Sequence, residues 1–216
     1  MAEERPLLRG ALVPVTPFQQ NCSIFWDDAT KEGMVVDPGG DVPRIVAAIG
    51  KTGARVTKIV LTHGHLDHAG GAAALRDALG GVPIEGPDPR DAFLLEKIAE
   101  QAAGYGFEAQ NVTPDRWLAE GETLAMGPHR FEILHCPGHT PGSLVFVHHP
   151  AKFLIAGDVL FQGSVGRTDF PYGDADALIT AIKTKLLVLP DDYAFICGHG
   201  PGSTIGVEKA TNPFLQ

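Results

Sequence analysis

The stretch Thr62-His63-Gly64-His65-Leu66-Asp67-His68-Ala69-Gly70-Gly71 places three histidines and one aspartate within six residues. It follows the apolar run 58–61, which predicts a strand, and it precedes the segment 70–79, which predicts a helix. Imidazole and carboxylate groups are protein ligands for zinc, and also for iron and manganese. Because side chains converge where a strand opens into a helix, this stretch predicts a metal site at the end of a strand.

The spacing of these side chains, H-x-H-x-D-H, suits a chain segment that wraps around metal. We expect His63, His65 and Asp67 to project to one side of an extended segment, and His68 to come round as the chain turns. The alternative is a polar loop with histidines clustered by chance, but four ligand-type residues at this spacing rarely serve packing alone. We therefore interpret the motif as metal-binding.

The same arrangement recurs later in the chain, where three more apolar runs end in a ligand-type residue beside glycine. In chain order, the four runs precede His63, His139, Asp158 and His199. Glycines at these points let the backbone approach a metal closely. The recurrence predicts that the four strand ends bring their ligands to a common sheet edge.

The candidate ligands are too many for one tetrahedral ion and suit two ions that share a bridge. The proposed division gives His63, His65 and His139 to one ion, Asp67, His68 and His199 to the other, and Asp158 to both. Two divalent ions outweigh the charge of two carboxylates, so the cluster stays electrophilic even with a bridging hydroxide. Zinc is the expected metal, with iron or manganese as alternatives.

Length and charge bound the class of protein. A chain of 216 residues suits one domain, expected over residues 1–216, with ample core. The net charge of −9 argues against a nucleic-acid partner, which requires a basic face. No apolar run approaches membrane-spanning length, and residues 1–6 show no secretion signal. The expected location is therefore the cytoplasm, without a membrane partner; the sequence does not specify an oligomeric state.

The remaining cysteines and histidines receive structural interpretations. The odd number of cysteines, three, predicts no disulfide framework, and each is expected to be a small buried side chain. These are Cys22, Cys136 and Cys197. Four histidines without a comparable motif are expected to be structural or exposed, with His148 and His149 in an exposed turn beside Pro150. The four are His129, His135, His148 and His149.

Short strands and helices alternate along the chain. Strands are predicted at 7–15, 22–26, 34–37, 58–61, 82–84, 131–134, 143–147, 153–156 and 194–196, with a loop and a short strand within 117–124. Helices are predicted at 42–49, 70–79, 91–103 and 174–187, with a last helical turn within 207–214. No linker or shift in composition divides the chain.

Four motifs, in this order and approximate spacing, resemble the ligand motifs of the metallo-β-lactamase superfamily. They are T-H-G-H-L-D-H, P-G-H-T-P-G, A-G-D and C-G-H. The resemblance covers essentially the whole chain. It implies an α/β fold, a four-layer αββα sandwich, with a binuclear metal site at one edge of the two sheets.

Within that superfamily the sequence resembles the glyoxalase II (hydroxyacylglutathione hydrolase) branch, in its compact single-domain form. The resemblance rests on Asp158, where zinc β-lactamases usually have cysteine, on the run G-R-T-D-F-P from Gly166, and on the N-P-F sequence from Asn212. Arg167 takes the place of a basic residue that contacts glutathione. A tyrosine found two residues after the last histidine in longer members is here Pro201, and the chain stops before their C-terminal helical glutathione-binding domain.

The resemblance implies hydrolysis of a small-molecule thioester, a glutathione conjugate such as S-lactoylglutathione, by a metal-bridging hydroxide. Asp67 is expected to orient the hydroxide as well as to bind metal. Arg167 is expected either to hold a substrate carboxylate or to form an ordinary ion pair with Asp169.

Two other functions remain open from the sequence. A persulfide dioxygenase shares the G-R-T-D-F run and uses one Fe(II), which His63, His139 and Asp158 would hold. The other is a non-catalytic metal-binding scaffold, which the complete ligand set disfavours. A β-lactamase is disfavoured by Asp158, and a nuclease by the acidic charge and short length.

Overall fold

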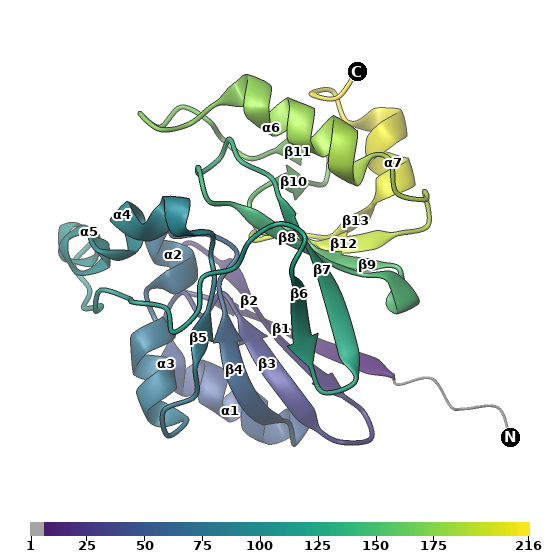
Figure 1. The fold of residues 1–216 in the computed structure, drawn as a ribbon. Helices are drawn as coiled ribbons and strands as arrows, with labels where there is room; N and C mark the ends of the chain where they lie inside the picture. The colour runs from purple at the N-terminus through teal and green to yellow at the C-terminus, as the bar shows by residue number, and fades with distance from the viewer. Residues whose placement is uncertain (1–6) are drawn as a thin grey trace, which may run out of the picture.

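The computed structural model describes residues 7–216, and two β-sheets organise them (Figure 1). Residues 1–6, where the sequence shows no secretion signal, lie outside the described part. The first sheet has five strands in chain order: β1 (Leu8–Val15), β2 (Gln20–Asp27), β3 (Glu32–Val36), β4 (Arg55–Val60) and β5 (Ile84–Glu85). β1 to β3 are antiparallel neighbours, whereas β3, β4 and β5 run parallel. The parallel strands require helical crossovers, which cover one face of the sheet.

The second sheet has six strands in the order β13-β12-β9-β8-β7-β6. Their bounds are β6 (Thr123–Met126), β7 (His129–His135), β8 (Leu144–His148), β9 (Phe153–Ile155), β12 (Ala194–Ile196) and β13 (Ser203–Thr204). A separate two-stranded hairpin, β10 (Leu160–Phe161) and β11 (Ser164–Val165), belongs to neither sheet.

Helices lie on the outer face of each sheet, as Figure 1 shows. On the first sheet they are α1 (Val42–Thr52), α2 (Leu66–Ala69), α3 (Ala72–Ala78), α4 (Ala92–Leu95) and α5 (Ile98–Gly104), with a 3-10 turn at Pro89–Asp91 before α4. On the second they are α6 (Ala175–Ala181), which continues as a π-helical turn at Ile182–Leu186, and α7 (Ile205–Thr211); a 3-10 turn spans His149–Ala151. Among residues 7–216, no helix has the length and apolar character needed to cross a membrane.

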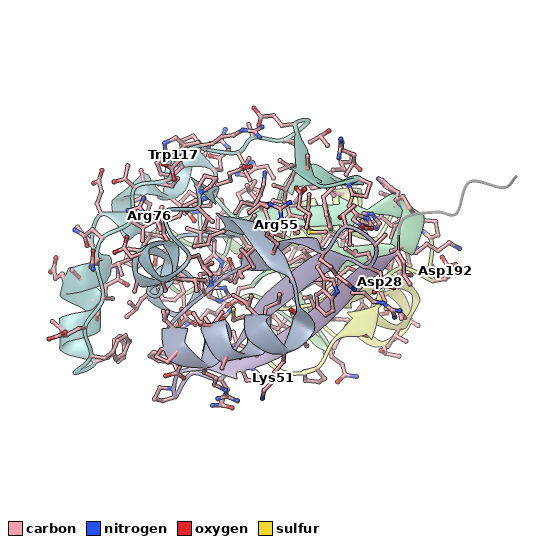
Figure 2. All side chains as sticks on the ribbon, turned by 90° about the horizontal axis from the view of Figure 1, so that it is seen from below. Asp28, Lys51, Arg55, Arg76, Trp117 and Asp192 are labelled. Atoms are coloured by element: carbon pink, nitrogen blue, oxygen red, sulfur yellow. The ribbon has the colours of Figure 1, made fainter. Side chains whose placement is uncertain are left out.

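Successive residues of the central strands serve different cores. Met34 and Val36 face the space between the sheets, whereas Val35 packs against the helices of the first sheet. In the second sheet, Phe146 lies between the sheets and Val145 packs toward α6. Strands buried on both faces are therefore apolar at consecutive positions. This arrangement is the predicted four-layer αββα sandwich, and Figure 2 shows side chains filling the space between its layers.

The predicted helix 70–79 is displaced. The helical turn α2 starts earlier, at Leu66, and α3 follows after a break at Gly70 and Gly71. A Cβ atom at Gly71 would lie 2.6 Å from the carbonyl oxygen of Pro38, so the break lets the chain pass close to that loop. Asp67 therefore lies on a helical turn, and the expectation of an extended segment there is wrong.

The predicted helix 91–103 is interrupted between α4 and α5. The carbonyl of Leu95 accepts a hydrogen bond from the amide of Val112, and the amide of Ala99 donates to the side chain of Asn111. The later loop thus takes over the backbone groups that would have joined the two helices. A pattern confined to residues 91–103 carries no sign of this tertiary contact.

Candidate metal centre

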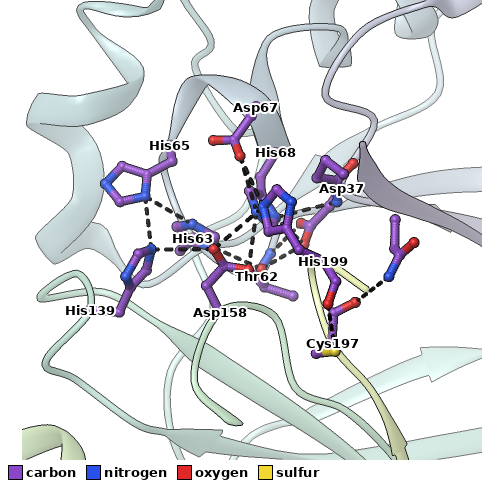
Figure 3. A network of polar contacts seen from close by, with 12 residues as sticks. Asp37, Thr62, His63, His65, Asp67, His68, His139, Asp158, Cys197 and His199 are labelled. Atoms are coloured by element: carbon purple, nitrogen blue, oxygen red, sulfur yellow. Dashed lines mark hydrogen bonds and ion pairs between the residues drawn. The ribbon is translucent and has the colours of Figure 1, made fainter. Parts of the chain in front are cut away.

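Seven side chains from both halves of the chain meet at one end of the two sheets (Figure 3). His63 and His65 lie in the loop after β4, and Asp67 and His68 lie on α2. The second half contributes His139 between β7 and β8, Asp158 after β9, and His199 after β12. The structure thus brings together all of the predicted ligands, although α2 rather than an extended segment presents two of them.

Three of these residues form one close group, the three-histidine group of His63, His65 and His139. Nε2 of His63 lies 3.1 Å from Nδ1 of His65, and Nε2 of His139 lies 2.9 Å from the same Nδ1. His63 and His139 are almost wholly buried. The three inner nitrogen atoms therefore border one small space.

A second group, the mixed group, consists of Asp67, His68 and His199. Oδ2 of Asp67 lies 3.1 Å from Nε2 of His199 and 3.8 Å from Nε2 of His68. His68 is fully buried, whereas Asp67 and His199 are partly open to solvent. The mixed group is therefore the more accessible of the two.

Asp158 lies between the groups (Figure 3). Its Oδ2 is 3.6 Å from Nε2 of His139 in the three-histidine group and 3.6 Å from Nε2 of His199 in the mixed group. Its Oδ1 is 3.3 Å from Nε2 of His68. A single carboxylate therefore reaches both groups.

Hydrogen bonds fix which nitrogen of three imidazoles carries the proton. Nδ1 of His68, His139 and His199 each faces an acceptor that has no hydrogen to donate, so each Nδ1 must be the donor. The acceptors are the Asp37 carboxylate for His68 at 2.9 Å, the Arg167 carbonyl for His139 at 2.8 Å and the Phe18 carbonyl for His199 at 3.1 Å. In the neutral rings, Nε2 therefore presents a lone pair to the centre.

Hydrogen bonds also orient the other two imidazoles. The hydroxyl of Thr62 donates to Asp37 at 2.6 Å, so its oxygen accepts the hydrogen bond from Nδ1 of His63 at 3.0 Å. Nδ1 is the inner atom of His65, and with a cation held there its Nε2 would carry the proton and donate to the hydroxyl of Tyr172, 2.8 Å away. In the neutral rings of His63, His68, His139 and His199, the inner nitrogen is thus unprotonated.

These lone pairs fit cations. Unprotonated nitrogens about 3 Å apart repel each other unless a positive charge lies between them, and a tetrahedral zinc ion with Zn–N bonds of 2.0–2.1 Å separates its ligand nitrogens by about 3.3 Å. Within residues 7–216, the buried Nε2 of His68 and Oδ1 of Asp158 have no hydrogen-bond partner, although they face the same space. Buried polar atoms normally have partners, so these atoms point to an ion.

The pKa shifts follow the same division. Burial is the main cause that lowers the pKa of each member of the three-histidine group, that of His65 to about 3, so these rings are neutral at pH 7. Burial also opposes protonation of His68 and His199, but nearby carboxylates outweigh it and raise the pKa of both. The mixed group thus attracts positive charge, as a cation site should.

Asp37 supports the centre from outside, and the sequence interpretation missed it. Its Oδ1 accepts from the amide of Thr62, and its Oδ2 accepts from the Thr62 hydroxyl and from His68. Asp37 is close enough to His63 and His68 to form a third possible metal-binding group with them, but these hydrogen bonds indicate that it orients a ligand instead. A signal was present, because Asp37 ends a predicted strand and two glycines follow after Pro38, which resembles the pattern that marked the other ligands.

Asp91 is a second supporting residue that the sequence did not indicate. Its carboxylate accepts hydrogen bonds from the amides of Gly64 and Gly142 and from the hydroxyl of Thr140. It thereby joins the loop of His63 and His65 to the loop of His139. Burial raises its pKa to about 6, against the effect of these hydrogen bonds.

Glycine is required where the backbone passes the ligands most closely. A Cβ atom at Gly198 would lie 1.9 Å from Oδ1 of Asp158 and 2.5 Å from the His68 ring. No side chain fits there without moving a ligand. The C-G-H motif thus requires glycine at this position for steric reasons.

A cavity of about 490 Å³ opens beside the seven side chains. Its walls are largely aromatic and aliphatic. They include Phe18, Leu66, Tyr105, Phe161, Val165, Phe170 and Tyr172. Arg167 is the only lysine or arginine among the described residues that line it.

Of the two sequence interpretations of Arg167, the structure shows the ion pair with Asp169. Its Nε and one terminal nitrogen donate to the two oxygens of Asp169, each at 2.7 Å. The guanidinium lies 4.5 Å above the centre of the Phe170 ring, at the wall of the cavity. Arg167 is exposed, so the ion pair leaves it accessible from solvent.

The remaining histidines lie away from the cavity. His148 is buried at the end of β8, so the prediction of an exposed turn is wrong for this residue. The amide of Ala151 donates to Nδ1 of His148, so its Nε2 donates to His129, which in turn donates to Asp27. His149 pairs with Glu132 at the surface. The three cysteines are free and buried, as predicted.

Comparisons with known proteins agree with this geometry. A sequence model described as the metallo-beta-lactamase superfamily matches residues 15–199. The hydroxyacylglutathione hydrolase GloC of Haemophilus influenzae is 50% identical over 207 residues, covering 95% of this chain and 97% of that protein. The crystal structure of the BLEG-1 B3 metallo-beta-lactamase has a TM-score of 0.88 and 34% identity, covering 96% of this chain and 100% of that one. TTHA1623, in a di-iron-bound form, has a TM-score of 0.84 and 36% identity over 95% and 100% of the two chains.

Proposed function

This chain belongs to the metallo-beta-lactamase superfamily, and from that membership we propose that it is a metallohydrolase that cleaves hydroxyacylglutathione thioesters. The expected reaction converts S-lactoylglutathione to lactate and glutathione. A relative that is 50% identical over nearly its whole length bears the name of this activity. The aromatic cavity with one arginine beside the ligand cluster supports a small organic substrate.

One observation carries the binuclear assignment. The carboxylate of Asp158 lies within 3.6 Å of ligand nitrogens in both groups, as a shared ligand must. We therefore assign one ion to the three-histidine group, one to the mixed group, and Asp158 to both. Zinc suits the nitrogen-rich first group, and the di-iron form of a related structure makes iron the main alternative.

The chain's own groups position the reactants. Two ions bound here supply Lewis acidity and lower the pKa of a bound water to about 7. Although burial opposes ionisation, His68 and His199 hold the pKa of Asp67 below its usual range, so Asp67 remains a hydrogen-bond acceptor that orients the attacking water. Asp67 also lines the cavity, where a thioester carbonyl can approach.

The leaving group needs little help from the protein. A thiolate leaves readily because a thiol is a stronger acid than an alcohol, so no general acid is required. Arg167 provides a cation for a carboxylate of the thiol carrier, in exchange for its bond to Asp169. The aromatic wall of Phe170 and Tyr172 covers the apolar part of the substrate.

The direct test is a metal-resolved assay of purified protein. Zinc-loaded protein should hydrolyse S-lactoylglutathione faster than the lactoyl thioester of N-acetylcysteamine, which lacks the glutathione carboxylates. Oxygen uptake on glutathione persulfide by protein holding one iron, without thioester hydrolysis, would contradict the proposal. Inactivity of zinc- and iron-loaded protein on all these substrates would indicate a binding scaffold instead.

A further inference from the structure

The hairpin β10–β11 forms one wall of the substrate cavity but is not part of either sheet. Phe161 from β10, Ser164 and Val165 from β11, and Arg167 just beyond it all line the cavity. The hairpin consists of two paired residues on each side. A hairpin this short is not stable alone, so other parts of the chain must hold it.

Two buried residues of the C-terminal segment bind the hairpin through hydrogen bonds. Oε2 of Glu208, on α7, accepts a hydrogen bond from the amide of Gly163 at 2.8 Å. The side-chain amide of Asn212 donates to the carbonyl of Ser164 at 3.0 Å and to Oε2 of Glu208 at 2.9 Å. Both side chains are 0% exposed, so these bonds are shielded from water.

The contact depends on acceptor oxygens at Glu208. Its Oε2 accepts from the amide of Gly163 and from the side-chain amide of Asn212, and its Oε1 accepts from the hydroxyl of Ser203. An apolar side chain of similar size would leave the amide of Gly163 and the side chain of Asn212 without this acceptor. Asn212 in turn accepts from the amide of Phe214, which explains the N-P-F sequence as a turn that fixes the asparagine.

The far side of the hairpin is packed in part: Leu160 is buried in the core beside α6, and Val165 is partly buried against the same core. A second cavity, of about 500 Å³, borders Ser164, Val165 and Arg167 from the side of α6. Phe214 lines this cavity and is 55% exposed. The hairpin thus lies between two cavities, and the hydrogen bonds to Glu208 and Asn212 fix its turn and β11 in addition to the packing of Leu160.

We propose that Glu208 and Asn212 are positioning residues that hold the β10–β11 hairpin against the metal centre and so determine how tightly the thiol carrier of the substrate binds. This inference rests on the proposed thioester hydrolysis. The hairpin contributes cavity wall but no metal ligand, so its displacement should weaken substrate binding and leave the chemical step nearly intact.

Glu208→Leu, which removes the acceptor oxygens at similar side-chain size, and Asn212→Ala test this in the full-length, zinc-loaded protein. Each variant should raise KM for S-lactoylglutathione about tenfold with kcat within about twofold, because loss of buried hydrogen bonds of this kind is worth roughly 1–3 kcal/mol. Metal content should stay unchanged. Hydrogen exchange at the amide of Gly163 should accelerate in Glu208→Leu.

Thr204→Ala is the matched control. It removes the N-cap hydrogen bond to the amide of Val207 and so destabilises the same helix without touching the hairpin. This variant should lower Tm and leave KM unchanged. A fall in Tm or kcat with unchanged KM in the Glu208 and Asn212 variants would assign them a merely structural role and overturn the inference.

A binding measurement separates this inference from the proposed function. S-methylglutathione, a thioether that cannot be hydrolysed, can be titrated calorimetrically into the wild type and the variants. Wild-type binding that weakens about tenfold in both variants supports the inference even if no thioester is hydrolysed. An unchanged Kd in the variants, or no binding by the wild type, overturns the inference. If the wild type hydrolyses the thioester and the variants have the same KM and Kd, the inference fails but the proposed function stands.

Discussion

Each imidazole of the metal centre is oriented by a hydrogen bond from its outer nitrogen. The partners differ: a threonine hydroxyl, a tyrosine hydroxyl, a carboxylate and two backbone carbonyls. Such partners fix ring orientation and raise the basicity of the ligand, and their loss typically costs 10–100-fold in metal affinity. At the scale of single residues, the centre therefore extends beyond the atoms that would touch metal.

Tyr172→Phe removes only the hydroxyl that accepts from His65. The variant should bind zinc at the three-histidine group about tenfold more weakly, because the ring loses its orienting partner. Competition with a chromogenic chelator measures this. Tyr105→Phe is the control, since Tyr105 lines the same cavity and its hydroxyl has no hydrogen-bond partner in the described part of the chain; equal affinities in both variants would contradict the prediction.

Asp158→Asn tests the shared ligand. Asparagine offers one neutral oxygen where the carboxylate offers two that share a negative charge, so it is a much weaker ligand for two cations. Metal content should fall from two ions per chain to one or fewer, and turnover should fall at least about 100-fold. Elemental analysis of the purified variant, combined with the thioester assay, measures both. Full activity with two bound ions would rule out the bridging assignment.

At the scale of secondary-structure elements, a buried chain of hydrogen bonds connects three strands away from the metal centre. Asp27 at the end of β2 accepts from His129 at the start of β7, and His129 accepts from His148 at the end of β8. The amide of Ala151 requires an unprotonated Nδ1 in His148. Burial accordingly lowers the pKa of His148 to about 4, with help from the neighbouring histidines.

This chain of hydrogen bonds makes stability depend on pH. The unfolded protein protonates His148 near pH 6.5 and the folded protein near pH 4, so the contribution is complete above pH 6.5 and is lost as pH falls through that window. The loss amounts to at most about 3 kcal/mol. Denaturant unfolding of metal-free wild type should therefore show a steep fall in unfolding free energy between these pH values.

His148→Gln supplies the comparison, because glutamine can donate to His129 and accept from Ala151 without titrating. The difference in unfolding free energy between variant and wild type should change with pH between 4 and 6.5 in favour of the variant. Both proteins share the metal ligands, so the difference cancels their titration. Parallel curves would show that His148 does not titrate as expected.

Asp91 acts between two loops. Asp91→Asn would turn an NH₂ group toward donors from the loop of His63 and the loop of His139, and should lower the unfolding free energy of metal-free protein by about 2 kcal/mol. Denaturant titration measures this. Asp115→Asn is the control, because Asp115 also accepts from a backbone amide but its side chain is 51% exposed. A similarly small effect from both substitutions would contradict the role of Asp91 in joining the two loops.

At the scale of the whole molecule, the metal centre joins the two sheets. The first half supplies four of the seven ligands and the second half supplies three. Bound ions therefore stabilise the packing of one sheet on the other, in addition to their part in the chemistry.

Removal of metal should consequently lower thermal stability. Ligand present at about 1,000 times its Kd stabilises the folded state by about 4 kcal/mol, which corresponds to a Tm shift on the order of 10 °C for a chain of this size. Calorimetry with and without a chelator measures the shift. Asp158→Asn, which holds less metal, should show a smaller shift, and an equal shift would mean that the chelator acts elsewhere.

The sandwich was predicted from the resemblance of four ligand motifs to a known superfamily, whereas the individual strands were predicted from their apolar runs, which are local signals. The sequence also indicated the seven candidate ligands that the structure brings together, because four of them follow one apolar run and each of the other three follows a run of its own. It could not predict the break between α2 and α3, because that depends on the loop near Pro38, nor the break before α5, which depends on Asn111 and Val112. Asp91 escaped for the same reason: its partners lie far away in the chain.

The division of the ligands between the halves has a consequence for how the protein acquires its metal. A chain whose sheets have not docked, or have docked with a strand shifted by one residue, presents an incomplete set of donors and cannot retain both ions. Metal uptake thus selects correctly assembled molecules. Only a molecule with the correct tertiary structure can therefore bind both ions.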